Sequence, residues 1–258
     1  MTSEDASRWI RRFHPAPEAP VRLVCLPHAG GSAVSYLPLS TLLTPDIEVL
    51  AVQYPGRQER HHEPAAASVP ELADRITAAL RPHAAEGSLA LFGHSMGAVL
   101  AFEVARRLAA AAWAQPLAAL FVSGRRAPSR ARVEEVHLLD DDGLVAEIEA
   151  LGGVAPGRLA DEELRQMVLP AVRADYRAIE TYRFERGPAP LTVPVCVLIG
   201  DRDPRVGVEE AEAWAAHTEA ATDVRVFADG GHFYLNDFPE AVAEHIRHRL
   251  HTLAPRSV

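Results

Sequence analysis

The sequence contains no lysine, since all 26 of its basic residues are arginine. The chain therefore cannot form a Schiff base with pyridoxal phosphate or use the lysine of a phosphate-binding P-loop. It has only two cysteines, Cys25 and Cys196, and each lies inside an apolar run. This pattern indicates buried thiols in a reducing compartment rather than a disulfide framework, so we expect a cytoplasmic protein.

The sequence also lacks long apolar segments and an excess of basic over acidic residues. No run reaches the roughly 20 residues that a membrane-spanning helix needs, and the polar start of the chain is unlike a secretory signal peptide. The net charge of −9 provides no dominant basic face for nucleic acid. No cysteine and histidine set has the spacing of a zinc site, so we expect no metal and no other cofactor.

Short apolar runs dominate what is present. The predicted strands are 21–26, 47–53, 88–93, 117–123, 193–200 and 223–228. Most are continuously apolar, which is typical of strands buried on both faces of a parallel sheet. Helical patterns lie between them, at 69–80, 98–112, 208–217 and 241–250. We therefore expect residues 1–258 to form a single α/β domain with a mostly parallel, doubly wound sheet.

Residues 125–190 interrupt this alternation, because they contain no strand-like run. Two helical patterns, 140–153 and 161–184, begin with acidic residues that suit a helix N-terminus. Pro170 lies inside the second and should kink it. We interpret the segment as a helical lid; a plain extension of the helical layer is the alternative. The side chains that either line such a lid or form ordinary helix core are Met167, Val168, Leu169, Tyr176, Ile179 and Tyr182.

The sequence Gly-His-Ser-Met-Gly at 93–97 follows an apolar strand and precedes an amphipathic helix. A G-x-S-x-G pattern in that context predicts a nucleophile elbow, in which a tight turn presents the serine above the sheet. Ser95 is therefore the predicted nucleophile. The backbone N–H of Met96 lies at the helix start, where an unpaired donor can stabilise an oxyanion.

A glycine-containing loop, Pro-His-Ala-Gly-Gly at 27–31, follows the first predicted strand. Small residues at this place allow the backbone to approach a substrate carbonyl. We expect Ala29 to supply the second oxyanion donor. Taken without the elbow, the loop would be interpreted as an ordinary turn.

Two further motifs follow late strands. Gly-Asp-Arg-Asp-Pro at 200–204 contains two candidate acids, and Gly-Gly-His-Phe at 230–233 contains His232. The order serine, acid, histidine is that of the α/β-hydrolases. His232 would act as general base, and an acid would orient its ring. We favour Asp203, because it lies far enough along the loop to reach a histidine, and Asp201 could instead cap the turn.

Arg125 and Arg126, with Arg130 and Arg132, form a local basic cluster in an acidic chain. We interpret Arg125 and Arg126 as a docking site for an acidic partner or a phosphate. A solvated loop is the alternative.

Taken together, five motifs resemble the type II thioesterases of polyketide and nonribosomal peptide biosynthesis. They are PHAGGSA at 27–33, YPGRQER at 54–60, GHSMGA at 93–98, GDRDP at 200–204 and GGHFYL at 230–235. The resemblance implies an α/β-hydrolase fold with a helical lid, and hydrolysis of acyl groups from the phosphopantetheine thiol of acyl or peptidyl carrier proteins. It implies Ser95, His232 and Asp203 as the triad, and Ala29 and Met96 as the oxyanion donors.

The catalytic motifs alone leave other functions open. A stand-alone carboxylesterase has the same triad, and an acyltransferase passes the same acyl-serine to an alcohol or amine. A non-catalytic binding protein on the same scaffold is a third alternative. Small acyl thioesters are expected substrates of the favoured function, without nucleic acid or membrane partners.

Overall fold

The computed structural model describes residues 8–84, 87–130, 132–187 and 189–253. Across these residues, seven strands form one sheet in the order β1-β3-β2-β4-β5-β6-β7. The strands are β1 (Ile10–Arg11), β2 (Val21–Leu26), β3 (Ile47–Val52), β4 (Ser88–His94), β5 (Leu120–Ser123), β6 (Val195–Gly200) and β7 (Thr222–Phe227). From β2 to β7 every neighbouring pair is parallel, which confirms the predicted sheet.

Burial explains why the strands were visible in the sequence. All residues of β2, β3 and β6 are buried, as expected for strands covered on both faces. The short strand β1 was not predicted, and it pairs antiparallel with β3 through Ile10 and Val52. Two residues are too few for a periodic signal, so only the pairing identifies this edge strand.

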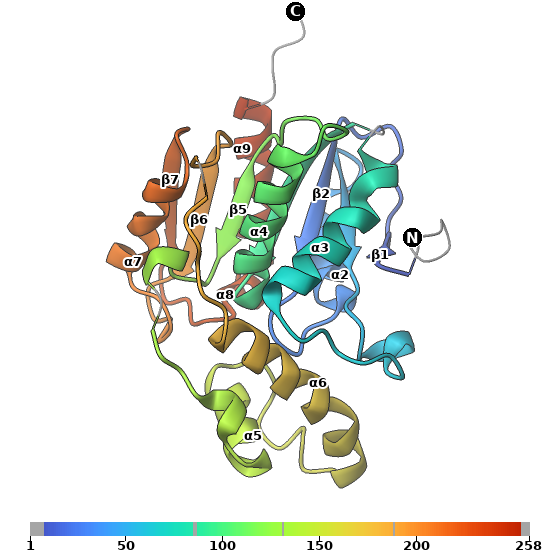
Figure 1. Cartoon of the computed structure of the whole chain (residues 1–258), viewed down its shortest axis with the longest axis vertical. Coiled ribbons are helices and arrows are strands. Elements are labelled where there is room, and N and C mark those ends of the chain that lie inside the picture. Colours follow the sequence, from blue (N-terminus) through green and yellow to red (C-terminus); the bar gives the residue numbers. More distant parts are fainter. Residues whose placement is uncertain (1–7, 85–86, 131, 188, 254–258) are drawn as a thin grey trace, which may run out of the picture.

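Helices cover both faces of the sheet (Figure 1). On one face α3 (Val69–Leu80), α4 (Met96–Ala110) and α7 (Val208–Glu212) contribute to the larger apolar core. On the other, α2 (Leu37–Leu43) and α9 (Pro239–Leu253) pack over a second core. Short 3-10 helices lie at Ala33–Tyr36, Gln58–Arg60, Arg81–His83, Pro128–Arg130, Val136–Leu138 and Ala213–His217, and α8 spans Tyr234–Asp237. The doubly wound arrangement is thus confirmed, although α2 and α8 were not predicted.

The chain between β5 and β6 carries α5 (Asp141–Ala150) and α6 (Glu162–Glu180) and has no strand within the described part of 125–190. Asp140 begins α5 by accepting a hydrogen bond from Gly143 N at 2.8 Å, and Asp161 does the same for Leu164 N at 2.9 Å in α6. Pro170 lies within α6, which is continuous. Both helices lie beyond the carboxyl ends of the parallel strands, below the sheet in Figure 1.

The structure also tests the predictions about the two cysteines and about membrane-spanning helices. Cys25 and Cys196 are free thiols and fully buried, as predicted. Among the helices of the described ranges, none combines the length and the apolar character needed to cross a membrane.

Candidate active site

Ser95 occupies a strained turn between β4 and α4. Its φ of 54° and ψ of −116° lie outside the regions that side-chain-bearing residues ordinarily adopt. The flanking glycines are required by space: a Cβ on Gly93 would lie 1.9 Å from Gly97 O, and one on Gly97 would lie 2.0 Å from Leu26 O. The turn therefore has the strand, strain and close packing that the motif predicted.

His232 and Asp203 form a buried pair at the ends of β7 and β6. His232 Nδ1 lies 2.8 Å from Asp203 Oδ2, and Asp203 Oδ1 accepts a hydrogen bond from Arg205 N at 2.8 Å. Both side chains are almost completely buried, whereas Asp201 is exposed. The structure therefore brings Asp203, not Asp201, to the histidine, and leaves Nε2 as the ring nitrogen free to exchange a proton.

The two loops that carry this pair are in backbone contact. A Cβ on Gly200 would lie 2.1 Å from Gly230 O, so only glycine allows the approach. One cavity joins the predicted residues, because Ser95, His232, Ala29 and Met96 all line it. Met96 is the first residue of α4, where the N–H has no carbonyl of a preceding turn to bind. The cavity thus contains a hydroxyl, an imidazole and two candidate backbone donors.

Two more imidazoles, those of His94 and His28, lie near His232. The His94 ring is buried, and its centroid lies 5.0 Å from that of the His232 ring. Its Nδ1 lies 2.9 Å from Ser123 Oγ. His28 packs edge-on against Phe233 at 4.7 Å. Burial, followed by the neighbouring His232, lowers the pKa of His28 to about 3 and the pKa of His94 well below its ordinary value. Both rings are therefore neutral at pH 7.

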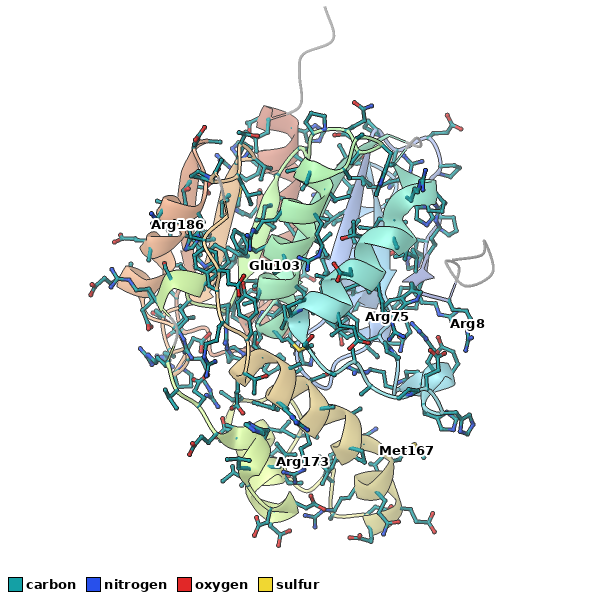
Figure 2. The ribbon with its side chains drawn as sticks, viewed as in Figure 1. Arg8, Arg75, Glu103, Met167, Arg173 and Arg186 are labelled. Carbon is teal, nitrogen blue, oxygen red and sulfur yellow. The ribbon has the colours of Figure 1, made fainter. Side chains whose placement is uncertain are left out.

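The insertion supplies much of the cavity wall. Val168, Tyr176 and Ile179 line the cavity as the lid interpretation expects. Leu169 belongs instead to the small core between α5 and α6. Met167 is 63% exposed on the outer side of α6 (Figure 2). Tyr182 follows the core alternative, since it packs against the larger apolar core and its hydroxyl donates to Glu103 Oε1 on α4 at 2.9 Å.

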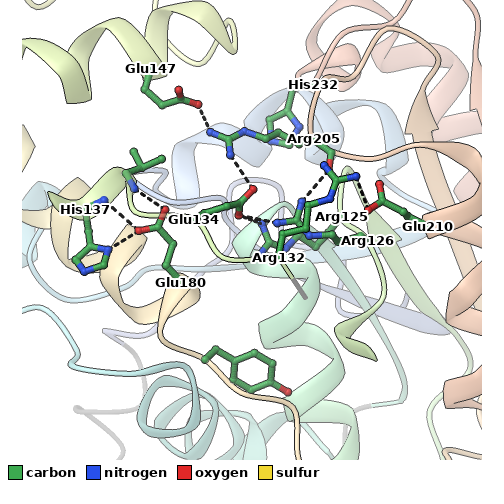
Figure 3. Close-up of polar contacts among 12 residues, drawn as sticks. Arg125, Arg126, Arg132, Glu134, His137, Glu147, Glu180, Arg205, Glu210 and His232 are labelled. Carbon is green, nitrogen blue, oxygen red and sulfur yellow. Dashed lines mark hydrogen bonds and ion pairs between the residues drawn. The ribbon is translucent and has the colours of Figure 1, made fainter. Parts of the chain in front are cut away.

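Arg125 and Arg126 do not form the exposed docking patch that we expected. Arg126 is 2% exposed, and its Nη2 lies 2.6 Å from Glu134 Oε2. Arg125 lines the cavity with Nη1 4.0 Å from the same carboxylate, and burial lowers its pKa to about 10. Figure 3 shows both arginines converging on Glu134 together with Arg205. This burial speaks against an exposed patch, and spacing along a loop could not reveal it; docking at these arginines stays a prediction.

Charged residues of the cavity wall were also missed by the sequence analysis. Glu134, Glu180 and Arg205 all line the cavity. The Glu180 carboxylate accepts hydrogen bonds from Val136 N at 2.9 Å and from His137 N at 3.0 Å (Figure 3). No local motif marks these residues, since their partners come from other segments. In the described ranges, no group of three or more His, Cys, Asp or Glu side chains could hold a metal ion.

A serine on such a turn, at the end of a central strand of a mostly parallel sheet, is characteristic of serine hydrolases with the α/β-hydrolase fold. The molecule is a member of this class.

Comparison with known proteins narrows the class. Residues 21–250 match the thioesterase domain family, so the chain belongs to the thioesterase family. It is 53% identical over 233 residues to the thioesterase PikA5 of Streptomyces venezuelae, covering 90% of this chain and 82% of that protein. It is 30% identical over 252 residues to the gramicidin S biosynthesis protein GrsT of Aneurinibacillus migulanus, covering 97% of each.

A solved structure is similar over the same extent. The type II thioesterase BorB from the borrelidin biosynthetic cluster has a TM-score of 0.87 and 49% identity, covering 94% of this chain and 98% of that one. The chain is therefore a serine hydrolase that acts on thioesters, as the sequence resemblance implied.

Proposed function

We propose that this enzyme hydrolyses acyl groups from the phosphopantetheine thiol of carrier proteins, and so clears aberrant or stalled chains from a polyketide or nonribosomal peptide synthase. The observation that carries the proposal is that Ser95 and His232 line the same cavity, while Asp203 holds Nδ1 of the His232 ring. The near-full-length similarity to a type II thioesterase of a biosynthetic cluster supports the substrate class.

In the first half-reaction, Ser95 Oγ attacks the thioester carbonyl carbon while His232 Nε2 takes the hydroxyl proton. Asp203 holds Nδ1 of the ring and stabilises the imidazolium that forms. Negative charge develops on the carbonyl oxygen, where the N–H groups of Ala29 and Met96 would bind it. Each such donor typically contributes about 10²- to 10³-fold in rate.

Collapse of the tetrahedral intermediate breaks the carbon–sulfur bond. The imidazolium of His232 protonates the departing pantetheine sulfur, and the acyl group remains on Ser95. Water then attacks this ester, giving one proton to His232, which passes it to Ser95 Oγ as the acid leaves. The thiol and the carboxylic acid are the two products.

The insertion at 125–190 would act as a lid that selects the acyl chain. Its apolar side chains Leu159, Val168 and Val172 line the same cavity as Ser95 and His232, and so suit an alkyl chain. Carrier proteins would have to present the thioester past these helices, so opening of the insertion would accompany substrate entry.

The test is acyl release from a holo carrier protein loaded with acetyl or propionyl. Wild type, Ser95→Ala and the control Ser129→Ala, whose serine lies outside the cavity, are compared on the carrier, on a small pantetheine thioester and on an oxygen ester. The proposal expects fastest release from the carrier, lost only in Ser95→Ala.

Other results would favour the alternatives. Activity on the oxygen ester alone would indicate a general esterase. Formation of an ester or amide when an alcohol or amine is added, in preference to the free acid, would indicate an acyltransferase. Absence of release together with no labelling of Ser95 by a fluorophosphonate would indicate a binding protein.

A further inference from the structure

The segment YPGRQER contributes no group to the proposed triad, yet it contains Arg57, a buried arginine whose partner lies on the insertion. Arg57, 8% exposed, meets Asp175 of α6, which is 2% exposed. The contact is bidentate: Nη1 lies 2.6 Å from Oδ2, and Nη2 lies 2.9 Å from Oδ1. The pair thus joins the segment after β3 to the insertion, two parts separated by more than a hundred residues.

The same ion pair holds the loop that follows β2. Asp175 Oδ2 also accepts a hydrogen bond from Gly30 N at 2.8 Å. Arg57 Nη1 donates to Gly31 O at 3.2 Å. Both contacts are made immediately after Ala29, the proposed oxyanion donor. A shift of Asp175 or Arg57 would therefore be transmitted to the peptide that carries this N–H.

Neighbouring residues hold the rest of the loop. The hydroxyl of Tyr54 donates to Pro27 O at 3.1 Å, and Gln53 Oε1 accepts from Ala33 N at 3.0 Å. At the centre, Gly30 has a φ of +77°, and a Cβ there would lie 2.8 Å from Cγ2 of Val172 on α6. The helix is thus in direct contact with the loop at the residue after Ala29.

We propose that Arg57 and Asp175 are positioning residues that make the oxyanion hole dependent on the seating of α6. When α6 is in place, Asp175 fixes Gly30 and Arg57 fixes Gly31, so that the Ala29 N–H points into the cavity. When α6 moves away, the loop loses both constraints. This inference rests on the proposed function, because it assigns a device to the same site.

Charge explains why an arginine accompanies the aspartate. An isolated carboxylate next to Gly30 would oppose negative charge developing at the oxyanion, and burying it alone would be costly. Burial disfavours the guanidinium charge, but Asp175 outweighs this effect and raises the pKa of Arg57. The pair therefore supplies a fixed acceptor for the loop with little net charge beside the reacting oxygen.

Another ion pair of the insertion offers a matched control. Arg173 on α6 binds Asp141 on α5 at 2.6 Å, and both side chains are at least partly exposed. This pair joins the two helices without contacting the loop. Its loss should affect the insertion but not the oxyanion donor.

The experiment compares Asp175→Leu, Asp175→Asn and the control Asp141→Asn. It measures kcat and KM on a small pantetheine thioester, together with the affinity of a trifluoromethyl ketone that forms a tetrahedral adduct with the serine. We expect Asp175→Leu to lower kcat about 10- to 100-fold with little change in KM. The affinity for the ketone should fall by a similar factor. Asp175→Asn keeps an acceptor for Gly30 and should recover part of both losses, while Asp141→Asn should match wild type.

The proposal is overturned if folded Asp175 variants melt earlier but keep wild-type kcat and ketone affinity, because the pair would then be purely structural. It is also overturned if Asp141→Asn shows the same kinetic loss. Should Asp175→Leu fail to fold, Asp175→Asn carries the comparison. If wild type releases no acyl group from the carrier, the proposed function fails, but the ketone titration still reads the loop and decides this inference separately.

Discussion

The α/β core and the inserted helices are built by different means. In the core, two large apolar clusters on either side of the sheet consist mainly of fully buried side chains. Among the residues that the structure describes, the corresponding cluster around α5 and α6 has five buried members, namely Val136, Leu144, Leu159, Leu169 and Val172. Partly exposed ion pairs such as Arg165–Asp142 add to it, and pairs of this kind contribute little free energy.

The difference indicates that the core and the insertion have separate roles. The proposed catalytic groups lie at the ends of strands, where packing holds them rigidly, and the proposed substrate wall lies on helices whose smaller core should open at lower cost. Substitutions in the two regions should therefore have unequal consequences.

The largest expected effect is on catalysis at the core. Asp203→Asn should lower kcat about 10⁴-fold, because the amide favours the wrong tautomer of the ring it holds. Asp201→Asn should remain within about twofold, since this side chain is exposed. Thioester hydrolysis by the two purified variants decides the assignment, and the reverse ranking would contradict it.

The next largest effect is expected on stability, when a glycine of the core and a glycine of the insertion are each replaced by alanine. Gly97→Ala should destabilise the protein by about 3 kcal/mol or more, because the new Cβ would meet Leu26 O at 2.0 Å. Gly152→Ala in the insertion should cost only about 1 kcal/mol, since it meets only the strain of a positive φ. Urea unfolding followed by circular dichroism measures both, and equal losses would remove the distinction between the regions.

The junction of the two regions can be tested at its arginines. Arg126→Gln should cost about 2–3 kcal/mol, because it breaks a buried ion pair while Glu134 retains Arg205. Arg132→Gln should cost less than about 0.5 kcal/mol, as that side chain is 54% exposed. Thermal melting measures both. An Arg126 variant of unchanged stability that turned over carrier-bound substrate poorly would restore the docking interpretation.

The smallest expected effect concerns pH. The pKa of His28 is lowered to about 3 by burial and by His232. Below the ordinary histidine pKa of 6.5, His28 therefore binds a proton in the unfolded chain but not in the folded protein. The contribution of His28 to stability should therefore be constant above pH 6.5 and fall by about 1 kcal/mol per pH unit below it. Urea unfolding at pH 7.5 and 5.5 should show a weaker loss in His28→Gln than in wild type. The exposed His61→Gln serves as control, and parallel losses in all three proteins would contradict the pKa.

Much of the fold was predictable because its signals are local. Apolar runs such as 21–26 and the 69–80 helix were located to the residue, since burial on both faces and an amphipathic period leave direct marks. The elbow at Ser95 was equally visible, because its glycines are required by backbone contacts within one short motif. By contrast, the edge strand β1 and the helix α2 leave no such pattern.

The amino-acid sequence by itself determined the parallel sheet, the strained turn at Ser95 and the order of the catalytic candidates. These follow from periodicity and from steric limits that act over a few residues. Only the tertiary structure decided that Asp203 rather than Asp201 reaches His232, that Arg126 is buried, and that Arg57 binds Asp175 of the insertion. Each of these outcomes depends on which side chains, distant in the sequence, are buried next to one another. Pairing of buried charges leaves no periodic pattern in the sequence.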